Sequence, residues 1–426
     1  MIINGGKEEQ LSPEQQLDII MSGTRFADET DDWIKNADKF GNLRNQMREE
    51  LLKKLKLGRP LRVYLGVDPT STSLHVGHFV PIQKLRKLQE LGHHIVFLIG
   101  DYTATIGDPS GQAGERKRFT HEEVSDMAKN YANLAFKVLD PEKTEVRFNS
   151  EWLAKLQFSD IIELACIFPM KQIISRRDFQ ARMDRGESLR FHEALYSLMQ
   201  GYDAYKLDCD IQVAGYDQHF NLLAGRNIQE HFGQAPHVML TNPLIIGTDG
   251  RKMSKSYNNT INIDDTPNDM YGKTMRIADE QLHDYLELTS SLSISDIDEL
   301  LEQLKSGENP MKAKKCLAFN LVEQYHSRED AEKAENNFYH VVQQKNISGE
   351  AEKIVVSSEL LNGSWMDLCS ELNLCKSKSE IRRLIQQGGF SVNQQQMKDI
   401  NAIVEIPAEG VHIKIGKRKF YNLVLK

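Results

Sequence analysis

Apolar residues near the start of the chain recur every three to four positions, the spacing of one face of an α-helix. The pattern covers 11–21 and, more strongly, 42–57, where Gly58, Arg59 and Pro60 predict its end. Short apolar runs follow at 61–67 and 95–100, separated by a helical stretch that ends at Gly92. Two strands joined by one helix predict a βαβ unit with parallel strands and a right-handed crossover.

Further strand patterns lie at 145–149, 210–214 and 238–246, with helical stretches between them. Strands alternating with helices predict a doubly wound, Rossmann-like α/β domain with a parallel sheet. In this architecture ligands bind in a crevice outside the carboxyl ends of the strands. We therefore search for candidate chemistry directly after the strands.

The pattern changes twice in the second half of the chain. It is helical without strands from 267 to about 344, and polar with little periodicity from 346 to 363. The last residues combine a basic helix at 377–387 with short strands at 390–394, 402–406, 411–416 and 420–425. We predict a helical segment (1–60), the α/β domain (61–262), an all-α domain (263–345), a linker (346–363) and a small α+β domain (364–426).

Composition narrows the class of protein. With 40% hydrophobic and 27% charged residues, the chain resembles ordinary soluble proteins. It has no apolar run of about 18 residues and no secretory signal pattern at its start, so we expect no membrane span and a cytoplasmic location. The five cysteines are scattered and form no C-x-x-C, which argues against a disulfide framework or a zinc site.

Charge is distributed unevenly along the chain. The whole chain carries −8, but residues 364–426 contain ten Lys and Arg against six Asp and Glu, so this segment is +4 and the remainder −12. A basic tail on an acidic body indicates an anionic partner for the tail. A merely solvated charged face is the alternative.

Residues 75–78 read His-Val-Gly-His and follow the first strand at the start of a helix. Gly77 permits close approach of a ligand to the backbone, and a helix N-terminus favours anions. His75 and His78, three apart, share one face and suit phosphate oxygens. The alternatives are a zinc pair, for which a third ligand is missing nearby, and two surface histidines without a role.

Residues 250–256 read Gly-Arg-Lys-Met-Ser-Lys-Ser, a polar, basic pattern typical of a surface loop. Lys252 and Lys255 are three apart and suit a polyphosphate that accumulates charge in a transition state. An ordinary basic loop is the alternative.

The two motifs in this order resemble those of the class I aminoacyl-tRNA synthetases. The stretches VYLGVDPT (63–70), IGDPSG (106–111), ALYSLMQGYD (194–203) and GYDQ (215–218) are similar to those of the bacterial tyrosyl-tRNA synthetases, in the branch with a K-M-S-K-S loop. The resemblance covers about 60–426. It implies activation of L-tyrosine with ATP to tyrosyl-adenylate and pyrophosphate, then transfer of tyrosine to the 3′-terminal adenosine of tRNA(Tyr). It also implies Mg²⁺ with the nucleotide, no metal held by the protein, and a homodimer.

The resemblance further implies roles for individual residues. The tyrosine-binding set is expected to be Asp108, Tyr196 and Gln200 for the α-amino group, Tyr64 and Asp203 for the phenolic hydroxyl, and Gln218 for the carboxylate. The ATP-binding set is expected to be Asp68, Thr70, Gly77, Gly215, Asp217 and Lys255. Catalysis is expected from His75, His78, Lys252 and Lys255, by positioning and charge stabilisation without a covalent nucleophile.

Spacing agrees with the tyrosine-binding set. Tyr196, Gln200 and Asp203 are four and three apart, so they line one stripe of a helix. A half-buried amphipathic face is the simpler interpretation, but a Gln and an Asp on an apolar stripe need partners. A ligand with an ammonium group and a phenol supplies them. Phenylalanine would leave Asp203 unpaired, the effect for which tyrosine-specific synthetases are themselves the known example.

The tail resembles the small ribosomal-protein-S-four-like RNA-binding domain. Its basic residues fall in the predicted helix and in a hairpin turn: Lys376, Lys378, Arg382, Arg383, Lys417, Arg418 and Lys419. Such clusters contact phosphates and fix register without reading sequence. We therefore expect them to contact tRNA.

Three other functions compete with this interpretation. An enzyme that activates an amino acid for a different acceptor would not need the basic tail, and a nucleotidyltransferase would share only the H-x-G-H motif. A non-catalytic RNA-binding relative would be expected to lose His78 or Lys255, and both are present. The chain also departs from the family pattern at Leu65 and Tyr216, the latter beside the expected ribose contact, and has Gln112 where the other branch has a lysine.

Overall fold

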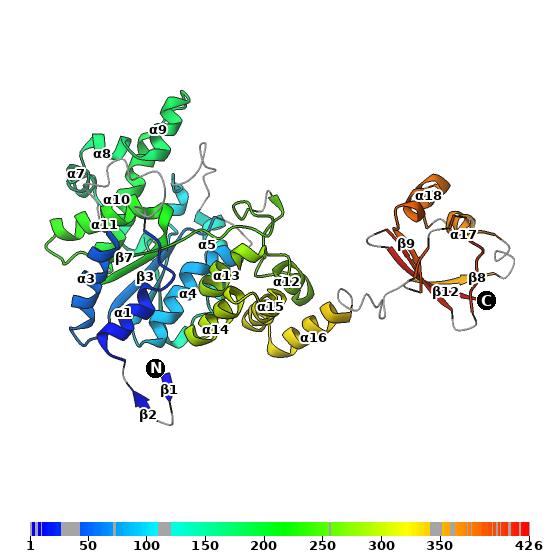
Figure 1. Ribbon diagram of the computed structural model, residues 1–426. Coiled ribbons are helices and arrows are strands. Elements are labelled where there is room, and N and C mark those ends of the chain that lie inside the picture. The colour runs from blue at the N-terminus through cyan, green and yellow to red at the C-terminus, as the bar shows by residue number, and fades with distance from the viewer. Residues whose placement is uncertain are drawn as a thin grey trace. The chain divides into compact units, whose positions relative to one another are not determined.

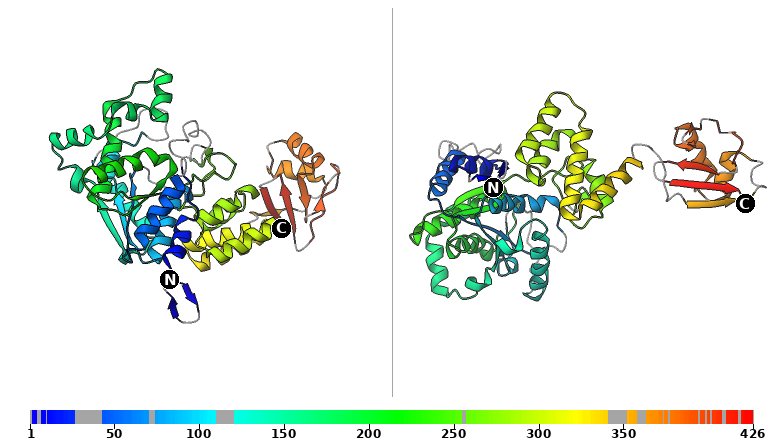
Figure 2. Two further views of the ribbon diagram at one scale, coloured as in Figure 1. Left: turned by 60° about the vertical axis from the view of Figure 1, so that its left-hand side comes forward. Right: turned by 90° about the horizontal axis from the view of Figure 1, so that it is seen from below.

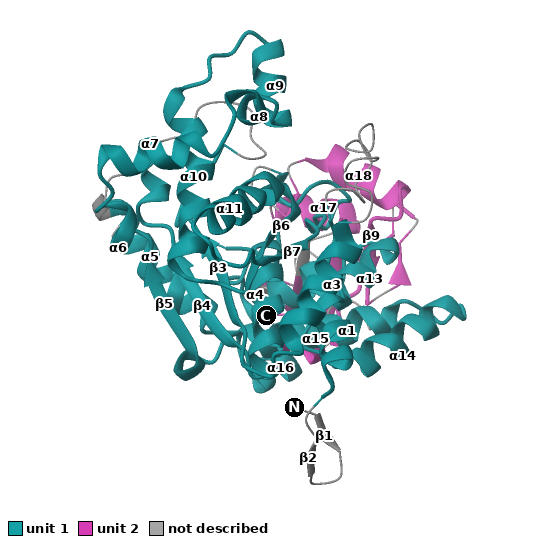
Figure 3. Ribbon diagram, turned by 90° about the vertical axis from the view of Figure 1, so that its left-hand side faces the viewer, with its two compact units in different colours: residues 1–332 teal, residues 333–426 magenta. Residues whose placement is uncertain are grey.

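The computed structural model describes residues 2–4, 7–9, 11–26, 43–70, 74–109, 121–254, 257–340, 352–357 and 363–425, apart from 373, 376, 394, 398, 401, 408–409 and 417–418. The chain divides into two units, residues 1–332 and 333–426 (Figure 3). Unit 1 begins with a short hairpin, β1 (Ile2–Asn4) and β2 (Lys7–Glu9). Each unit is described by itself below.

Five parallel strands form the centre of unit 1 (Figure 1). They are β3 (Arg62–Val67), β4 (His94–Ile99), β5 (Thr144–Phe148), β6 (Ile211–Gly215) and β7 (Val238–Asn242). Their order is β5-β4-β3-β6-β7, with every neighbouring pair parallel. The chain therefore builds one side of the sheet outward from β3 and then returns to build the other. This is the doubly wound α/β fold predicted from the sequence.

Helices connect the strands. α4 (Val76–Glu90) joins β3 to β4, α5 (His121–Ala135) joins β4 to β5, and α11 (His219–His231) joins β6 to β7. The long connection from β5 to β6 contains α6 (Ser150–Leu153), α7 (Phe158–Cys166), α8 (Met170–Ile174), α9 (Arg177–Asp184) and α10 (Phe191–Lys206). The strand order reverses between β3 and β6, where the connecting segments diverge and leave a crevice at the carboxyl ends.

Two glycines let α10 approach α11 closely. A Cβ atom on Gly201 would lie 2.8 Å from Ile228 Cδ1 and 3.0 Å from the backbone nitrogen of Gly225. One on Gly225 would lie 2.9 Å from the His237 ring. Any larger residue at either position would push the helices apart, so these glycines hold α10, with its predicted substrate residues, against α11.

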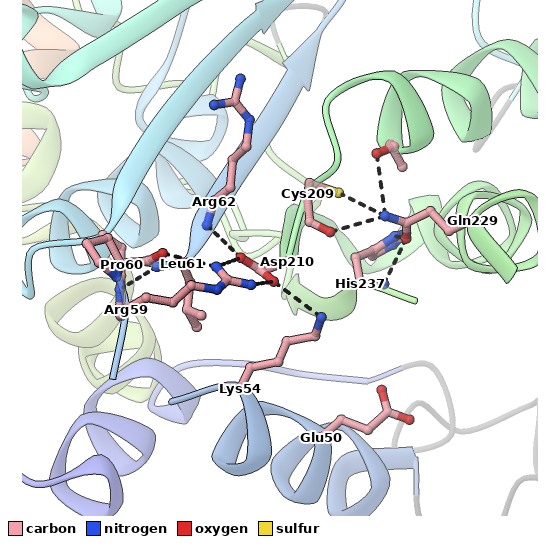
Figure 4. Close-up of polar contacts among 12 residues, drawn as sticks. Glu50, Lys54, Arg59, Pro60, Leu61, Arg62, Cys209, Asp210, Gln229 and His237 are labelled. Carbon is pink, nitrogen blue, oxygen red and sulfur yellow. Dashed lines mark hydrogen bonds and ion pairs between the residues drawn. The ribbon is translucent and has the colours of Figure 1, made fainter. Parts of the chain in front are cut away.

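The N-terminal helix α3 (Leu43–Leu55) packs against the outer strand β7, where the backbone N–H of Met239 lies 3.3 Å from Met47 Sδ, and α1 (Pro13–Met21) packs against α3 and α4. Asp210, which precedes β6, accepts hydrogen bonds from the Arg59 guanidinium at 2.6 and 2.8 Å and from the backbone N–H of Arg62 at 3.0 Å (Figure 4). Lys54 of α3 lies 3.4 Å from the same carboxylate. Burial opposes the charge, but these partners together hold the pKa of Asp210 below its ordinary value.

A helical segment completes unit 1, as the sequence predicts. It contains α12 (Pro267–Thr274), α13 (Leu282–Thr289), α14 (Ile294–Lys305), α15 (Met311–Tyr325) and α16 (Arg328–Phe338), which continues past the boundary of the unit. The segment packs on α4: the rings of Phe79 and Tyr325 meet edge to face at 5.3 Å, and Gln83 donates to the carbonyl of Thr289. The finer division of residues 1–332 into domains remains a prediction.

Unit 2 contains a five-stranded sheet with the order β10-β9-β11-β12-β8 (Figure 2). The strands are β8 (Glu352–Val356), β9 (Phe390–Val392), β10 (Gln395–Gln396), β11 (Val411–Ile415) and β12 (Lys419–Leu425), and the helices are α17 (Trp365–Glu371) and α18 (Lys378–Gln386). Trp365, Ile381 and Phe390 lie in its buried core. This is the small α+β architecture predicted for the tail.

The sequence interpretation differs from unit 2 in two places. Residues 346–363 are not linker throughout, because β8 pairs in parallel with β12 and buries Val356 in the core. The strand was missed because its apolar run is only three residues long, too short to show a period of two. The strand expected at 402–406 is reduced to a single bridge between Ile403 and Ser364.

Candidate active site

A cleft of about 320 Å³ lies at the carboxyl ends of β3 and β6. Its lining comes from β3 and the residues after it, the first turn of α4, the facing stripe of α10 and the segment after β6. The cleft brings together most of the predicted site: Tyr64, Asp68, Thr70, Gly77, His78, Asp108, Tyr196, Gln200, Asp203, Gly215 and Gln218. Residues up to about 150 positions apart in the sequence therefore converge where the strand order reverses.

The innermost part of the cleft holds a buried carboxyl group. Asp203 is 3% exposed and accepts hydrogen bonds from Trp152 Nε1 at 2.7 Å and Asn149 Nδ2 at 3.2 Å. Burial raises the pKa of Asp203 to about 8, against the lowering effect of these two donors. The Tyr64 hydroxyl, also fully buried here, has no hydrogen-bond partner among the residues that the structure describes, and burial raises its pKa well above the usual range. The Asp203 carboxyl group and the Tyr64 hydroxyl, the two groups predicted to meet the phenol of the substrate, can therefore form a hydrogen bond to a phenolic hydroxyl.

A second network ties Asp68 to α10. Its carboxylate accepts hydrogen bonds from the Tyr196 hydroxyl at 2.8 Å and the Thr103 hydroxyl at 2.7 Å. Thr103 in turn accepts from Asn149 at 3.0 Å. Tyr196 was predicted to hold an α-amino group and Asp68 to address phosphates, and here they contact each other. The network connects the two ends of the cleft.

Gln218 and Asp108, two residues predicted to bind the substrate tyrosine, also contact each other. Gln218 Nε2 donates to Asp108 Oδ2 at 2.7 Å, and Gln218 Oε1 accepts from Asn221 Nδ2 at 2.7 Å. Gln218 lies just after β6 and Asp108 in the segment after β4. A carboxylate acceptor and an amide donor lie side by side there, the pair of groups that an amino acid's ammonium and carboxylate require.

The H-x-G-H motif lies at the start of α4, as predicted. The rings of His75 and His78 lie close together, with centroids 3.8 Å apart and planes tilted by 35°, and the backbone N–H of His75 donates to His78 Nδ1 at 3.2 Å. His78 is exposed and lines the cleft, whereas His75 is half-buried and does not line it. A Cβ on Gly77 would lie 3.0 Å from the His75 ring and 3.6 Å from Met253 Sδ. The glycine therefore makes room both for the histidine and for the second motif.

The second motif begins in a tight hairpin beside that helix start. Ile246 pairs with Lys252, and the backbone N–H of Ile263 donates to the carbonyl of Leu74, which anchors the segment after the loop to the entrance of α4. Lys252 is exposed. Lys255 lies outside the described residues.

Asn259 holds this hairpin together. It is 2% exposed; its Nδ2 donates to Asp249 Oδ1 at 2.7 Å and to the Lys252 carbonyl at 3.1 Å, while its Oδ1 accepts from the Ser254 N–H at 2.8 Å. One buried amide therefore fixes the path of the backbone on both sides of Met253. It was not predicted from the sequence, although its position after the basic motif was a usable signal.

Some predicted positions lie apart from the cleft wall. Asp217 is exposed on the turn after β6 and, like Tyr216, does not line the cleft. The wall beside Tyr216 is formed by Ala214 and Gly215. Leu65 is buried and also lines the cleft. Gln112 lies outside the described residues.

Asn149, Trp152 and Thr103 are functional candidates that the sequence interpretation missed. Asn149 directly follows β5, at the same edge of the sheet as the other site residues, so its position was a signal. Trp152 and Thr103 gave none, because indole and hydroxyl side chains are common in cores and turns. Their role depends on Asp203 and Asp68, the carboxyl groups to which they donate.

Only part of the predicted tRNA-binding set is described in unit 2. Arg382 and Arg383 are exposed on α18, while Lys378 pairs with Asp367 at 2.7 Å. Lys419 begins β12 and so lies in a strand, not in the turn. Lys376, Lys417 and Arg418 lie outside the described residues.

The described residues contain neither a cluster of metal-binding side chains nor a helix that could span a membrane. No group of three or more His, Cys, Asp or Glu side chains in that part of the chain is arranged to hold a metal ion. Among the same residues no helix is both long enough and apolar enough to cross a membrane.

Family models match both parts of the chain. Residues 56–343 match tRNA synthetases class I (W and Y), and residues 366–408 match the S4 domain. The tyrosine–tRNA ligase of Carboxydothermus hydrogenoformans is 44% identical, covering 89% of this chain and 94% of the relative. That of Aquifex aeolicus is 41% identical over 97% of this chain and its own full length. The chain belongs to the bacterial tyrosyl-tRNA synthetase family.

Solved structures agree on the fold. The tyrosyl-tRNA synthetase of Archaeoglobus fulgidus, crystallised with L-tyrosine, covers 76% of this chain at a TM-score of 0.58 and 23% identity. A truncated mitochondrial tyrosyl-tRNA synthetase from Aspergillus nidulans has the same TM-score at 19% identity. The predicted tyrosyl-tRNA synthetase family and the class of enzyme, an aminoacyl-tRNA ligase, are confirmed. Membership of this family rules against the nucleotidyltransferase that would share only the H-x-G-H motif.

Proposed function

We propose that this chain joins L-tyrosine to tRNA(Tyr), and that the residues of the cleft carry the first step. One observation supports this most directly: Asp203 and the Tyr64 hydroxyl are buried at the inner end of the cleft, and no described residue pairs with that hydroxyl. A buried polar group without a partner is unfavourable by about 1–3 kcal/mol, so the pocket favours a ligand that brings a hydroxyl to that point. Asp203 can pair with that hydroxyl in either state, because a protonated carboxyl group donates to it and a carboxylate accepts from it.

The substrate's other groups have counterparts towards the mouth of the cleft. The ammonium group is proposed to take the place of the Gln218 amide on Asp108, with Gln200 and the Tyr196 hydroxyl beside it. Gln218 then turns its N–H donors to the carboxylate. This assignment orients the carboxylate outward, towards the start of α4, where phosphates are favoured.

The first step is attack of the tyrosine carboxylate on the α-phosphate of ATP, with pyrophosphate as leaving group. His75, His78, Lys252 and Lys255 are proposed to stabilise the charge that develops on the phosphates. Thr70 and Gly77 are proposed to let the phosphates approach the helix start, and Gly215 and Asp217 to meet the ribose. Magnesium belongs to this proposal as an ion carried by the ATP phosphates.

The second step is attack of the terminal adenosine hydroxyl of tRNA on the mixed anhydride of the adenylate. Unit 2 is proposed to hold the tRNA by its phosphates, through Arg382 and Arg383 on α18 and the other basic residues of the tail. A cytoplasmic location is part of the same proposal.

A homodimer is also proposed. Several large apolar side chains are exposed on α7, α8 and the first turn of α10, segments that lie together in Figure 1: Phe158 (77% exposed), Ile162, Met170 and Phe191 (69%). Such exposed apolar surface is typical of a subunit interface. Light scattering coupled to size exclusion should give twice the chain mass, and Phe191→Asp should lower it to one.

Pyrophosphate exchange into ATP, tested with each of the twenty amino acids, is the experiment that decides the first step. We expect exchange with tyrosine and little with phenylalanine. Exchange that follows another amino acid would reject the substrate assignment. Tyrosine-dependent exchange without charging of tRNA would favour the alternative in which the activated amino acid goes to a different acceptor.

A further inference from the structure

A buried arginine lies behind the cleft without lining it. Arg176, at the start of α9, has a side chain that is 4% exposed. Its guanidinium pairs with Asp178 at 3.0 Å and lies over the rings of Phe179 and Phe220, at 4.7 and 5.0 Å from their centroids. A buried charge is retained only when paired and hydrogen-bonded, and these contacts satisfy one side of the guanidinium.

The other side of the guanidinium points to α10 and α11. Arg176 Nη1 donates to Ser197 Oγ at 2.7 Å and to Asn221 Oδ1 at 3.2 Å, and Ser197 Oγ donates to the same Asn221 oxygen at 2.7 Å. Asn221 is fully buried. Its amide nitrogen then donates to Gln218 Oε1 at 2.7 Å, and Gln218 Nε2 points to Asp108.

This chain of hydrogen bonds can run in only one direction. A guanidinium has five N–H donors and no acceptor, so the Asn221 atom facing it must be the oxygen. The Asn221 nitrogen consequently faces Gln218 and requires the oxygen of that amide. Gln218 is left with its nitrogen towards the cleft. An amide without such a neighbour presents its oxygen or its nitrogen about equally well, because the two ends have the same shape.

We propose that Arg176, acting through Asn221, is a positioning residue that makes Gln218 a hydrogen-bond donor towards the cleft. The proposal rests on the proposed function, in which Gln218 meets the tyrosine carboxylate. A carboxylate only accepts hydrogen bonds, so a reversed Gln218 would turn a carbonyl oxygen towards it and repel it. The network thus gives the cleft a preference for an amino acid over the corresponding amine.

Binding of tyrosine and of tyramine, which lacks the carboxylate, tests the proposal by calorimetry without ATP. Asn221→Asp keeps the size of the side chain and the partner of Arg176 but removes the N–H that faces Gln218. We expect the ratio of tyramine to tyrosine dissociation constants to fall by about 10- to 100-fold, the usual strength of a hydrogen bond to a charged group. Tyramine binding itself should change little, whereas general damage to the pocket would weaken both ligands alike.

A matched control changes Asp178, which pairs with the Arg176 guanidinium on the side away from Asn221. Asp178→Asn is the reverse amide-for-carboxylate exchange and leaves Asn221 in place, so the ratio should keep its wild-type value. Arg176→Lys is the second test: a lysine keeps the buried positive charge but cannot reach Asp178, Ser197 and Asn221 together, and the ratio should fall part of the way. It also decides the matter if Asn221→Asp does not fold.

The outcomes separate this inference from the proposed function. A wild-type protein that binds tyrosine no better than tyramine rejects the role of Gln218, and this inference with it. A wild-type preference that survives unchanged in Asn221→Asp, or in Arg176→Lys, overturns the inference alone. Equal weakening of both ligands overturns it as well, because it marks a structural role only.

Discussion

The indole nitrogen of Trp152, in α6, donates to Oδ1 of Asp203, in α10, across 2.7 Å, and so joins the first and the last helix of the connection from β5 to β6. The contact lies beneath the cleft and is inaccessible to water, since both side chains are buried. It orients the carboxyl group that we propose to meet the substrate phenol. Asp203 should therefore affect both the preference for tyrosine over phenylalanine and, through its pKa, the pH dependence of stability.

Asp203→Asn should lower the efficiency of tyrosine activation by about 10- to 100-fold, since hydrogen bonds to charged or buried polar partners have this strength. Activation of phenylalanine should change little, so the preference for tyrosine narrows. Pyrophosphate exchange with both amino acids measures it. An unchanged preference would mean that Asp203 is not the partner of the phenol.

The same variant should alter the pH dependence of stability. The pKa of Asp203 is about 8 in the fold and about 4 in an unfolded chain. Between these values the folded protein binds more protons than the unfolded one, so wild-type stability from this group is present below pH 4 and lost as pH rises through 8. The difference in the midpoint of thermal unfolding between Asp203→Asn and the wild type should therefore shift in favour of the variant as the pH rises from 4 to 8.

His78→Ala should slow adenylate formation while leaving tyrosine binding nearly unchanged. His78 lies at the start of α4, where it lines the cleft and is exposed to an arriving phosphate. Loss of one such donor raises the barrier by about 2.7–4 kcal/mol. Rapid-quench measurement of adenylate formation tests it, with the exposed His283 changed to Ala as control. Formation at wild-type speed would remove His78 from the catalytic set.

Asn259→Asp should also slow adenylate formation, through the loop that carries Lys252. The new carboxylate would face the Asp249 carboxylate and the Lys252 carbonyl, so two present hydrogen bonds would become repulsive. Tyrosine affinity should stay at its wild-type value, because the tyrosine end of the cleft is untouched. Asn258→Gly is the matched control: Asn258 has a φ of 50°, which glycine adopts readily. Equal effects in both variants would contradict a specific role for Asn259.

His93 should make the protein less stable in mild acid. Its Nδ1 accepts from the backbone N–H of Leu61 at 3.3 Å, and burial lowers its pKa to about 4. A lowered pKa means that stability is present above about pH 6.5, the unfolded value, and is lost as pH falls towards 4. We expect the midpoint of thermal unfolding to fall less between pH 6.5 and 4 in His93→Asn than in the wild type, because asparagine keeps an acceptor but cannot be protonated. A slope equal to that of the wild type would assign the acid sensitivity to other groups, such as the buried His237.

Deletion of residues 350–426 should separate the two steps. The cleft lies wholly within unit 1, so tyrosine-dependent pyrophosphate exchange should persist. The removed segment includes the basic residues of the tail, so tRNA should bind more weakly and with a shallower dependence on salt. Charging at full efficiency would contradict the role of unit 2 in tRNA binding, and loss of both activities would mean that unit 1 needs it to fold.

The parallel sheet and the crevice were predictable because they depend on local patterns. β3, β4, β6 and β7 are mainly apolar runs, and the H-x-G-H and K-M-S-K-S motifs follow strands at the edge where parallel strands end together. The partners of the motif residues were not predictable in this way. Trp152 reaches Asp203 and Arg176 reaches Asn221 across gaps of 51 and 45 positions, and nothing in the local pattern fixes which side chains meet. β8 was not predicted for a related reason: its three apolar residues form a strand because they pair with β12, which lies some 60 positions later in the sequence.

The position of β12 in the sheet of unit 2 has a consequence for the order in which the protein is made. β12 lies between β11 and β8, and it is the last strand of the chain. A chain still being synthesised therefore holds β8 for some 60 residues before the strand that joins it to the rest of the sheet exists. Unit 1 contains its cleft long before that point. A chain interrupted before residue 419 would activate tyrosine but lack the strand that joins β8 to β11, so the proposed grip on tRNA requires synthesis through β12.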